Sequence, residues 1–255
     1  EIAQAGGGIL NSARRLRTTP LEALVTSLRH NADRFLLLGT TTIEAKSGYG
    51  LSTESELTQL RAIREVEGSH PLTLVPTFLG AHEIPEDYRA DRESYVRLLC
   101  EEMIPRVARE GLAEACDIFC EEHVFTVPES RRILQAAKDA GLQVKLHADE
   151  IRPTGGAELA AEMGALSADH LVAISDTGIE RMREAGVIPI LLPATSFFLD
   201  LPEDAPGRKM LDRGLAVALG PLVGGAVVGP SDHDEDAAAS GRVGHPDAVL
   251  DVGPA

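Results

Sequence analysis

The 255-residue sequence is poor in cysteine, in basic residues and in long apolar runs. Its three cysteines, Cys100, Cys116 and Cys120, form no CxxC pair, which argues against a disulfide framework and against a zinc ribbon. No apolar run approaches the roughly 20 residues of a membrane-spanning helix, and no signal peptide is visible. The chain has only 24 basic residues against 40 acidic ones, and it has no basic stripe that could displace counterions from nucleic acid. We therefore expect a cytoplasmic protein with reduced cysteines and with neither a membrane nor a nucleic-acid partner.

What the sequence does contain is a regular alternation of strand-like and helix-like segments. With 44% hydrophobic and 25% charged residues, it has the composition of an ordinary globular protein. Strands separated by helices indicate βαβ units, and about seven of them at this repeat length predict an α/β fold, an incomplete (β/α)8 TIM-type barrel. The missing first strand is expected upstream of Glu1, where the chain opens without a methionine, as a fragment would. The strands are expected at 35–39 with 41–44, 72–79, 116–119, 143–147, 167–171, 187–192 and 215–219.

The helices of this pattern have recognisable start signals. Two begin with a Thr-x-x-Glu capping box, Thr53 with Glu56 and Thr126 with Glu129. Proline at position 20 and serine or aspartate at 175–176 are further start signals. The helices are expected before residue 34 and at 53–67, 92–109, 126–141, 156–164 and 175–186.

Residues 221–255 differ in character from the rest of the chain. They contain no aromatic residue, no lysine and only Arg242 as a strong base, and Gly, Ala, Val, Asp and Pro dominate them. This composition predicts a disordered acidic tail. A second hypothesis is a frameshift or a misassembled gene end, because codons for Gly, Ala, Val, Asp and Glu all begin with G. The expected organisation is a partial barrel over 1–220 and an anomalous tail over 221–255.

Polar side chains lie at the ends of several expected strands. His147 ends one strand and is followed closely by Glu150, while His82 and His170 end two others. Tyr49 lies in a glycine-rich loop after the first strand. Because the carboxyl ends of barrel strands meet at one mouth, we expect these side chains to share a site. Imidazoles beside a carboxylate suit metal ligation or general acid–base chemistry, although Glu150 can face the site only if it begins a loop.

Six segments of the chain together form a specific sequence signature, whereas any one of them alone is a weak signal. The segments are Gly6-Gly7-Gly8-Ile9, 44–51, 77–82, 145–150, 155–159 and 167–171. They resemble imidazolonepropionase, an amidohydrolase-superfamily hydrolase of histidine degradation, and the likeness runs from residue 1 to about residue 220. The resemblance implies a metal-dependent barrel that opens the ring of 4-imidazolone-5-propanoate to give N-formimidoyl-L-glutamate.

The resemblance also implies roles for the residues at the strand ends. In the family, one zinc or iron ion is held by an HxH pair on the first strand, a histidine on the fifth and an aspartate on the eighth. His147 matches the fifth-strand ligand, and Glu150 matches the acid that contacts the substrate ring and assists proton transfer. His170 matches the histidine beside the attacking water, and Tyr49 and His82 match substrate-binding positions. The implied partner is the small-molecule substrate, and the resemblance allows a homodimer.

The sequence departs from the family at the other metal ligands. It contains no HxH pair, it lacks the family's arginine for the substrate carboxylate, and Leu222 takes the place of the metal-binding aspartate. The small β domain of the family is missing as well. We therefore expect weak metal binding and impaired activity in this chain. Two alternatives remain open: another amidohydrolase such as a cyclic amidine deaminase, against which the Lys46–Gly50 loop argues, or an inactive remnant of a defective gene.

Overall fold

Strands and helices alternate along the described part of the chain, which in this computed structural model is residues 9–220. The expected glycine-rich loop at 6–8 and the expected tail lie outside these residues. The strands are β1 (Thr42–Lys46), β2 (Thr73–Ala81), β3 (Ala115–Cys120), β4 (Gln143–Val144), β5 (Leu146–Ala148), β6 (Ser167–His170), β7 (Ile188–Leu191) and β8 (Ala218–Leu219). The helices are α1 (Ile9–Leu16), α2 (Leu21–Leu37), α3 (Thr53–Glu67), α4 (Arg92–Leu98), α5 (Ile104–Arg109), α6 (Val127–Asp139), α7 (Gly156–Met163), α8 (Asp176–Ala185), α9 (Pro193–Phe198) and α10 (Gly207–Asp212), with a 3-10 turn at Glu86–Tyr88 and a π-helical turn at Leu99–Met103.

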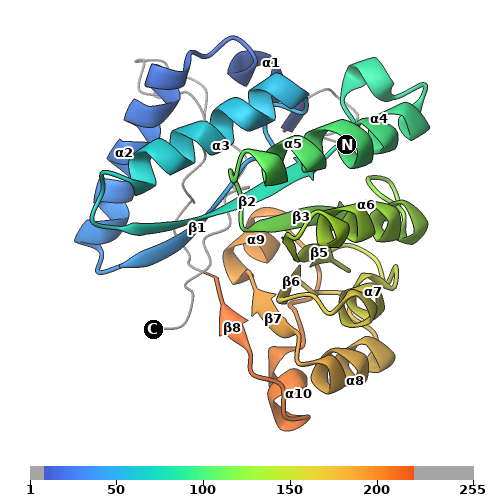
Figure 1. Ribbon diagram of the computed structural model, residues 1–255. Coiled ribbons are helices and arrows are strands. Elements are labelled where there is room, and N and C mark those ends of the chain that lie inside the picture. The colour runs from blue at the N-terminus through green and yellow to red at the C-terminus, as the bar shows by residue number, and fades with distance from the viewer. Residues whose placement is uncertain (1–8, 221–255) are drawn as a thin grey trace.

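The strands form one parallel, curled sheet in the order β1-β2-β3-β5-β6-β7-β8, with β4 also paired to β3. Lys145 alone separates β4 from β5, so these two strands take one position in the curl. The helices follow the strands around its outside (Figure 1). Within residues 9–220 no ladder joins β1 to β8, and these strands are the two edges. The expected α/β barrel architecture is confirmed as an open, partial barrel whose strands all end at one side.

The first expected strand was placed too early in the sequence. Residues 35–38 are not a strand, because α2 continues to Leu37 and β1 begins only at Thr42. Phe35 lies on the buried face of α2, whereas Leu37 and Leu38 at the end of the helix are 86% and 68% exposed. A short apolar run does not distinguish a helix end from a buried strand, which is the reason for the error.

The expected helix at 92–109 forms, but it is not a regular α-helix throughout. A π-helical turn at Leu99–Met103 separates α4 from α5. Pro105 is the second residue of α5 and has no N–H to donate to the preceding turn of the helix. Helices α9 and α10 follow β7 and were not predicted, since each is only six residues long and shows no sustained period.

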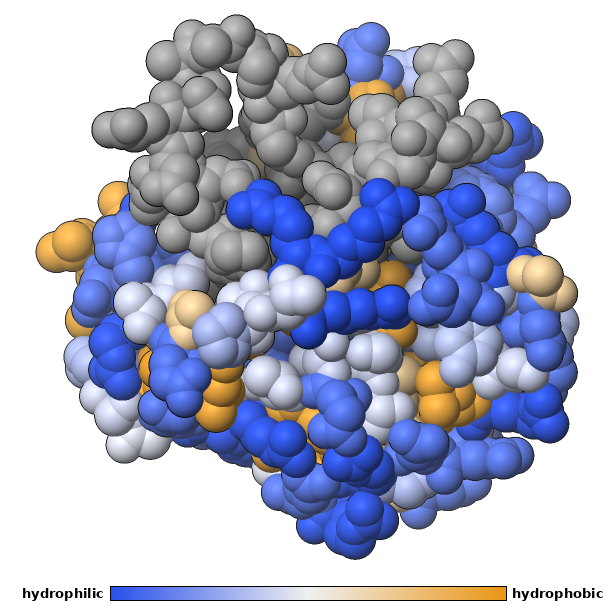
Figure 2. Space-filling model, turned by 90° about the horizontal axis from the view of Figure 1, so that it is seen from above, coloured by the Kyte–Doolittle hydropathy of each residue, from blue (hydrophilic) through white to orange (hydrophobic). Residues whose placement is uncertain are grey.

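The large apolar side chains lie between the sheet and its helices. Leucine, isoleucine, phenylalanine and tyrosine side chains from nearly every element form one continuous buried cluster. The face seen in Figure 2 is mainly hydrophilic, and its apolar areas are small and separate. None of the helices within residues 9–220 is long and apolar enough to span a membrane.

Replacing Thr126 with alanine is expected to lower the free energy of unfolding by about 1 kcal/mol. The capping box predicted for α6 is present: the Thr126 hydroxyl accepts from the N–H of Glu129, and the Glu129 carboxylate accepts from the N–H of Thr126 at 2.8 Å. Urea unfolding measures the change. Thr26→Ala, at an exposed position inside α2, is the matched control and should cost little. Equal losses in both variants would contradict the capping role.

Candidate functional site

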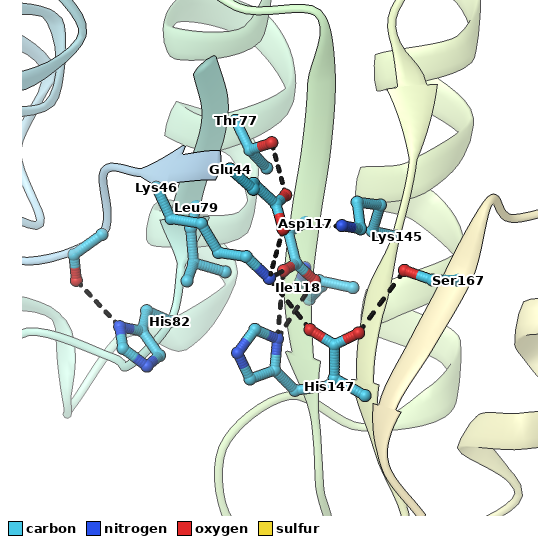
Figure 3. A network of polar contacts seen from close by, with 12 residues as sticks. Glu44, Lys46, Thr77, Leu79, His82, Asp117, Ile118, Lys145, His147 and Ser167 are labelled. Carbon is cyan, nitrogen blue, oxygen red and sulfur yellow. Dashed lines mark hydrogen bonds and ion pairs between the residues drawn. The ribbon is translucent and has the colours of Figure 1, made fainter. Parts of the chain in front are cut away.

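A group of charged and hydroxyl side chains fills the inner face of the sheet. They recur at every second residue, as expected for side chains on one face of a strand. Figure 3 shows them pointing toward one another from neighbouring strands. The group consists of Glu44 and Lys46 from β1, Thr77 from β2, Asp117 from β3, Lys145 and His147 around the start of β5, and Ser167 and Asp169 from β6, all of them buried.

Lys46 lies at the centre of this inner polar cluster. Its Nζ lies 2.5 Å from Asp117 Oδ2, 3.0 Å from Asp169 Oδ2 and 3.5 Å from Glu44 Oε2. Burial acts to lower the pKa of Lys46, but attraction by these three carboxylates raises it well above its ordinary value. Lys145 supplies a second ammonium group, 2.6 Å from Glu44 Oε2. The three carboxylates are therefore matched by two cations inside the sheet.

His147 lies where the inner polar cluster meets the carboxyl ends of the strands. Its Nδ1 is 3.2 Å from Asp117 Oδ1 and 3.1 Å from Oδ2, and its side chain is 6% exposed. Burial opposes a charged imidazole, yet the attraction of Asp117 and its hydrogen bond raise the pKa of His147 above the usual value. Burial likewise acts to raise the pKa of Asp117, but His147 and Lys46 hold it well below its usual range.

All five residues predicted for the site lie together at the strand ends. The ring centroid of His147 is 5.3 Å from that of His170 and 5.9 Å from that of His82. Tyr49 stands edge-on to His82 at 5.2 Å. Nδ1 of His170 is 3.2 Å from Glu150 Oε1. The sequence-based grouping therefore matches the geometry, although the role of each residue stays a prediction.

Glu150 reaches this group because β5 ends at Ala148, before the acid. Asp149 has a φ of 49°, in the left-handed region, and this residue starts the loop that the sequence required. His170 and Leu171, with φ values of 71° and 58°, turn the chain in the same way at the end of β6. Left-handed conformations are uncommon for residues other than glycine, and strained backbone of this kind clusters at functional sites.

A buried carboxylate holds the loop that carries Tyr49. Glu56 accepts from the N–H groups of Gly48, Gly50 and Leu51 at 2.7, 2.9 and 2.8 Å. The capping box predicted for Thr53 and Glu56 is therefore wrong: the residue before α3 is Ser52, and the loop amides take the carboxylate instead. Gly48 must be glycine, since its φ is 104° and a Cβ would lie 2.7 Å from the carbonyl oxygen of Leu79.

A second carboxylate holds the loop that carries Glu150. Asp149 Oδ1 accepts from the N–H groups of Thr154, Gly155 and Gly156 and from the Thr154 hydroxyl. Its Oδ2 accepts from the N–H of Ala157 at 2.9 Å. These donors include the first amides of α7, where the helix dipole also favours a negative charge.

Asp149→Asn is expected to lower the free energy of unfolding by about 1–3 kcal/mol, because an amide group would face the N–H of Ala157. Asparagine tolerates the left-handed backbone, so the variant tests the acceptor and not the conformation. Urea unfolding gives the loss, and amide exchange of Gly155 and Gly156 should speed up. Asp200→Asn is the control, since Asp200 is exposed and has a φ of 51°. A control as damaging as Asp149→Asn would contradict this account.

Three buried side chains of the inner polar cluster are of the types that could hold the metal ion implied by the resemblance. Ligand atoms of Asp117, His147 and Asp169 all lie within 4.8 Å of one another. However, Lys46 already neutralises both carboxylates at hydrogen-bond distance, so a second cation between them would face its charge. Because Nδ1 of His147 faces Asp117, Nε2 is the nitrogen suited to a metal on the side of the strand ends. A metal ion therefore fits at Nε2 of His147 and not between Asp117 and Asp169.

Sequence reasoning missed most of the inner polar cluster. Glu44, Lys46, Asp117 and Asp169 were not singled out, because single charged residues within short strands look like the solvated half of an alternating pattern. The available signal was their position in strands expected to be covered by helices. In an all-parallel sheet, a charged residue inside a strand must find a partner within the protein.

The chain was compared with proteins of known identity. No family model matches it. The curated imidazolonepropionase of Shouchella clausii is 54% identical over 218 residues, which cover 86% of this chain and 48% of that protein. That of Geobacillus thermodenitrificans is 53% identical over 219 residues, covering 86% of this chain and 51% of that protein. Over most of its described length, this chain is therefore similar to the imidazolonepropionases. It spans about half the length of the curated relatives that it matches.

Solved structures confirm the barrel architecture. An adenine deaminase from Arthrobacter aurescens has a TM-score of 0.61 at 16% identity, over 84% of this chain and 66% of that one. An atrazine chlorohydrolase variant from the same species, complexed with zinc and atraton, has a TM-score of 0.59 at 15% identity, over 83% and 51%. At these identities the likeness shows the fold alone, an α/β barrel.

Proposed function

We propose that this chain carries the ring-opening site of an imidazolonepropionase, which hydrolyses the cyclic amide of 4-imidazolone-5-propanoate to N-formimidoyl-L-glutamate. The observation that carries the proposal is the convergence of Tyr49, His82, His147, Glu150 and His170 at one end of the sheet. These residues come from four different strand ends of a chain about half identical to curated imidazolonepropionases.

The chemistry requires one water and a proton carrier. The water oxygen bonds to the ring carbonyl carbon, the C–N bond breaks, and the departing nitrogen takes up a proton. In the proposal, Glu150 carries that proton, and His170 at 3.2 Å orients its carboxylate and the attacking water. Tyr49 and His82 lie beside each other and hold the ring.

Zinc or iron would be held at Nε2 of His147, where it would polarise the carbonyl and acidify water. The 255 residues contain no His-x-His pair, and Leu222, in the place of the family's aspartate, lies outside the described residues. We propose on this basis that metal binding and turnover are weak in this chain. One imidazole does not complete the four-coordinate sphere typical of zinc.

Turnover of a substrate panel tests the proposal. The full chain is incubated with zinc or iron and with 4-imidazolone-5-propanoate, and in parallel with adenine and guanine as cyclic amidines. The expected result is slow, metal-stimulated loss of the imidazolone alone. Faster deamination of a purine would favour the cyclic amidine deaminase, and no turnover with either metal would favour an inactive remnant. Both results would contradict the proposal.

A further inference from the structure

We propose that Asp117 is a positioning residue, which accepts a hydrogen bond from Nδ1–H of His147 and so presents Nε2 to the site at the strand ends. The inference deepens the proposed function, on which only its metal-binding consequence rests. The tautomer that it assigns to His147 does not depend on any activity.

The contact between the two side chains has little freedom. Both oxygens of Asp117 lie within 3.2 Å of Nδ1, and β3, which carries Asp117, is the direct neighbour of β5, which carries His147. In Figure 3 the dashed lines reach the ring nitrogen that faces Asp117, while the other ring nitrogen points away from the inner polar cluster. A neutral imidazole has one N–H, so a hydrogen bond at Nδ1 leaves the lone pair on Nε2.

Asp117 is itself held from two further directions. The N–H of Ile118 donates to Oδ1 at 2.7 Å, and Nζ of Lys46 donates to Oδ2 at 2.5 Å. The side chain is fully buried, with an exposed fraction of 0%. A carboxylate with both oxygens engaged cannot rotate without breaking these contacts, so it fixes the plane of the imidazole ring as well as its tautomer.

The inner polar cluster also offers a matched control. Asp169 is equally buried and also contacts Lys46, at 3.0 Å, but its other oxygen accepts from the hydroxyl of Ser167 at 3.4 Å. Asp169→Asn therefore removes the same charge from the same cluster and leaves the contact of His147 with Asp117 in place. A purely structural role of the cluster would make the two aspartates equivalent.

The direct test is nitrogen-15 NMR of the histidine side chains in the metal-free full chain at about pH 9, well above the ordinary pKa of an imidazole. The expected spectrum shows His147 as the Nδ1–H tautomer in the wild type and in Asp169→Asn. In Asp117→Ala, Nε2–H becomes the major form. An Nε2–H tautomer of His147 in the wild type would overturn the proposal whether or not any variant folds. An unchanged tautomer in folded Asp117→Ala would overturn it as well.

Metal affinity gives the second readout. Zinc competition against a chelator should show about a 10–100-fold loss in Asp117→Ala, with a smaller loss in Asp169→Asn. If the tautomers behave as expected and neither the wild type nor the variants bind zinc, the proposed function fails and the positioning role stands. If both variants bind zinc as well as the wild type does, the positioning role fails and the proposed function stands.

Discussion

Lys46→Met is expected to destabilise the fold by about 3–5 kcal/mol at neutral pH, because it leaves buried carboxylates without their shared cation. Asp117 and Asp169 both lie within 3.0 Å of Nζ of Lys46, and both are fully buried. Methionine has a similar length and is apolar, so the change removes the charge with little loss of volume. Urea unfolding at neutral pH measures the difference from the wild type.

The pH dependence gives this prediction a sign. In the wild type, burial raises the pKa of Asp117 and Asp169, but Lys46, Lys145 and His147 hold it below the usual range. Carboxylates with a lowered pKa contribute stability above their unfolded pKa, and this stability is lost as the pH falls. In Lys46→Met that contribution shrinks, so the gap between the two chains should be widest at neutral pH and narrow toward acid.

A surface lysine provides the control for this substitution. Lys209 pairs with Asp176 across two exposed side chains. Lys209→Met should cost no more than about 1 kcal/mol and should show no such pH dependence. If Lys46→Met costs no more than this control, Lys46 does not serve as the internal cation of the site.

Glu150→Gln is expected to lower the metal-stimulated turnover of 4-imidazolone-5-propanoate by about 10²–10⁴-fold, because glutamine cannot carry a proton. The amide keeps the shape of the side chain and can still contact His170, now 3.2 Å from the carboxylate. The substrate affinity should change much less than kcat. Steady-state kinetics of the full chain gives both quantities.

Glu158→Gln separates this effect from a general loss of acidic charge. Glu158 lies in α7 and accepts from the hydroxyl of Ser175, within the layer of outer helices. It should keep turnover within about twofold of the wild type, because its contacts are with the outer helices and not with the candidate site. Equal turnover in Glu150→Gln and the wild type would remove Glu150 from the proton path.

The sequence was sufficient for the architecture because most of the expected strands are separated by an expected helix, and several of these helices have a recognisable start signal. The Thr126 capping box and the Ser175 cap are both present in the structure. The site residues could be grouped from sequence because three histidines stand at the ends of three different expected strands, and a parallel barrel brings such ends together. His82, His147 and His170 were found in this way.

The partners of those residues could not be read from the sequence. Asp117 contacts His147 across 30 positions, and Lys46 contacts Asp169 across 123, so no local pattern connects them. Glu56 was misread for a similar reason. A Thr-x-x-Glu pattern looks the same in the sequence whether the carboxylate caps the helix or holds the loop before it. Which amides a carboxylate meets depends on the loop packed against it.

Isotope analysis of the product tests the central claim most directly. The full chain and its His147→Ala variant are each incubated with zinc and 4-imidazolone-5-propanoate in water enriched in oxygen-18. Mass spectrometry then gives the masses of the products. We predict that the wild type forms N-formimidoyl-L-glutamate with a single oxygen-18 atom from water and that His147→Ala forms none above the uncatalysed background. An absence of this product with the wild type, or equal amounts with both chains, would contradict a hydrolytic site built around His147.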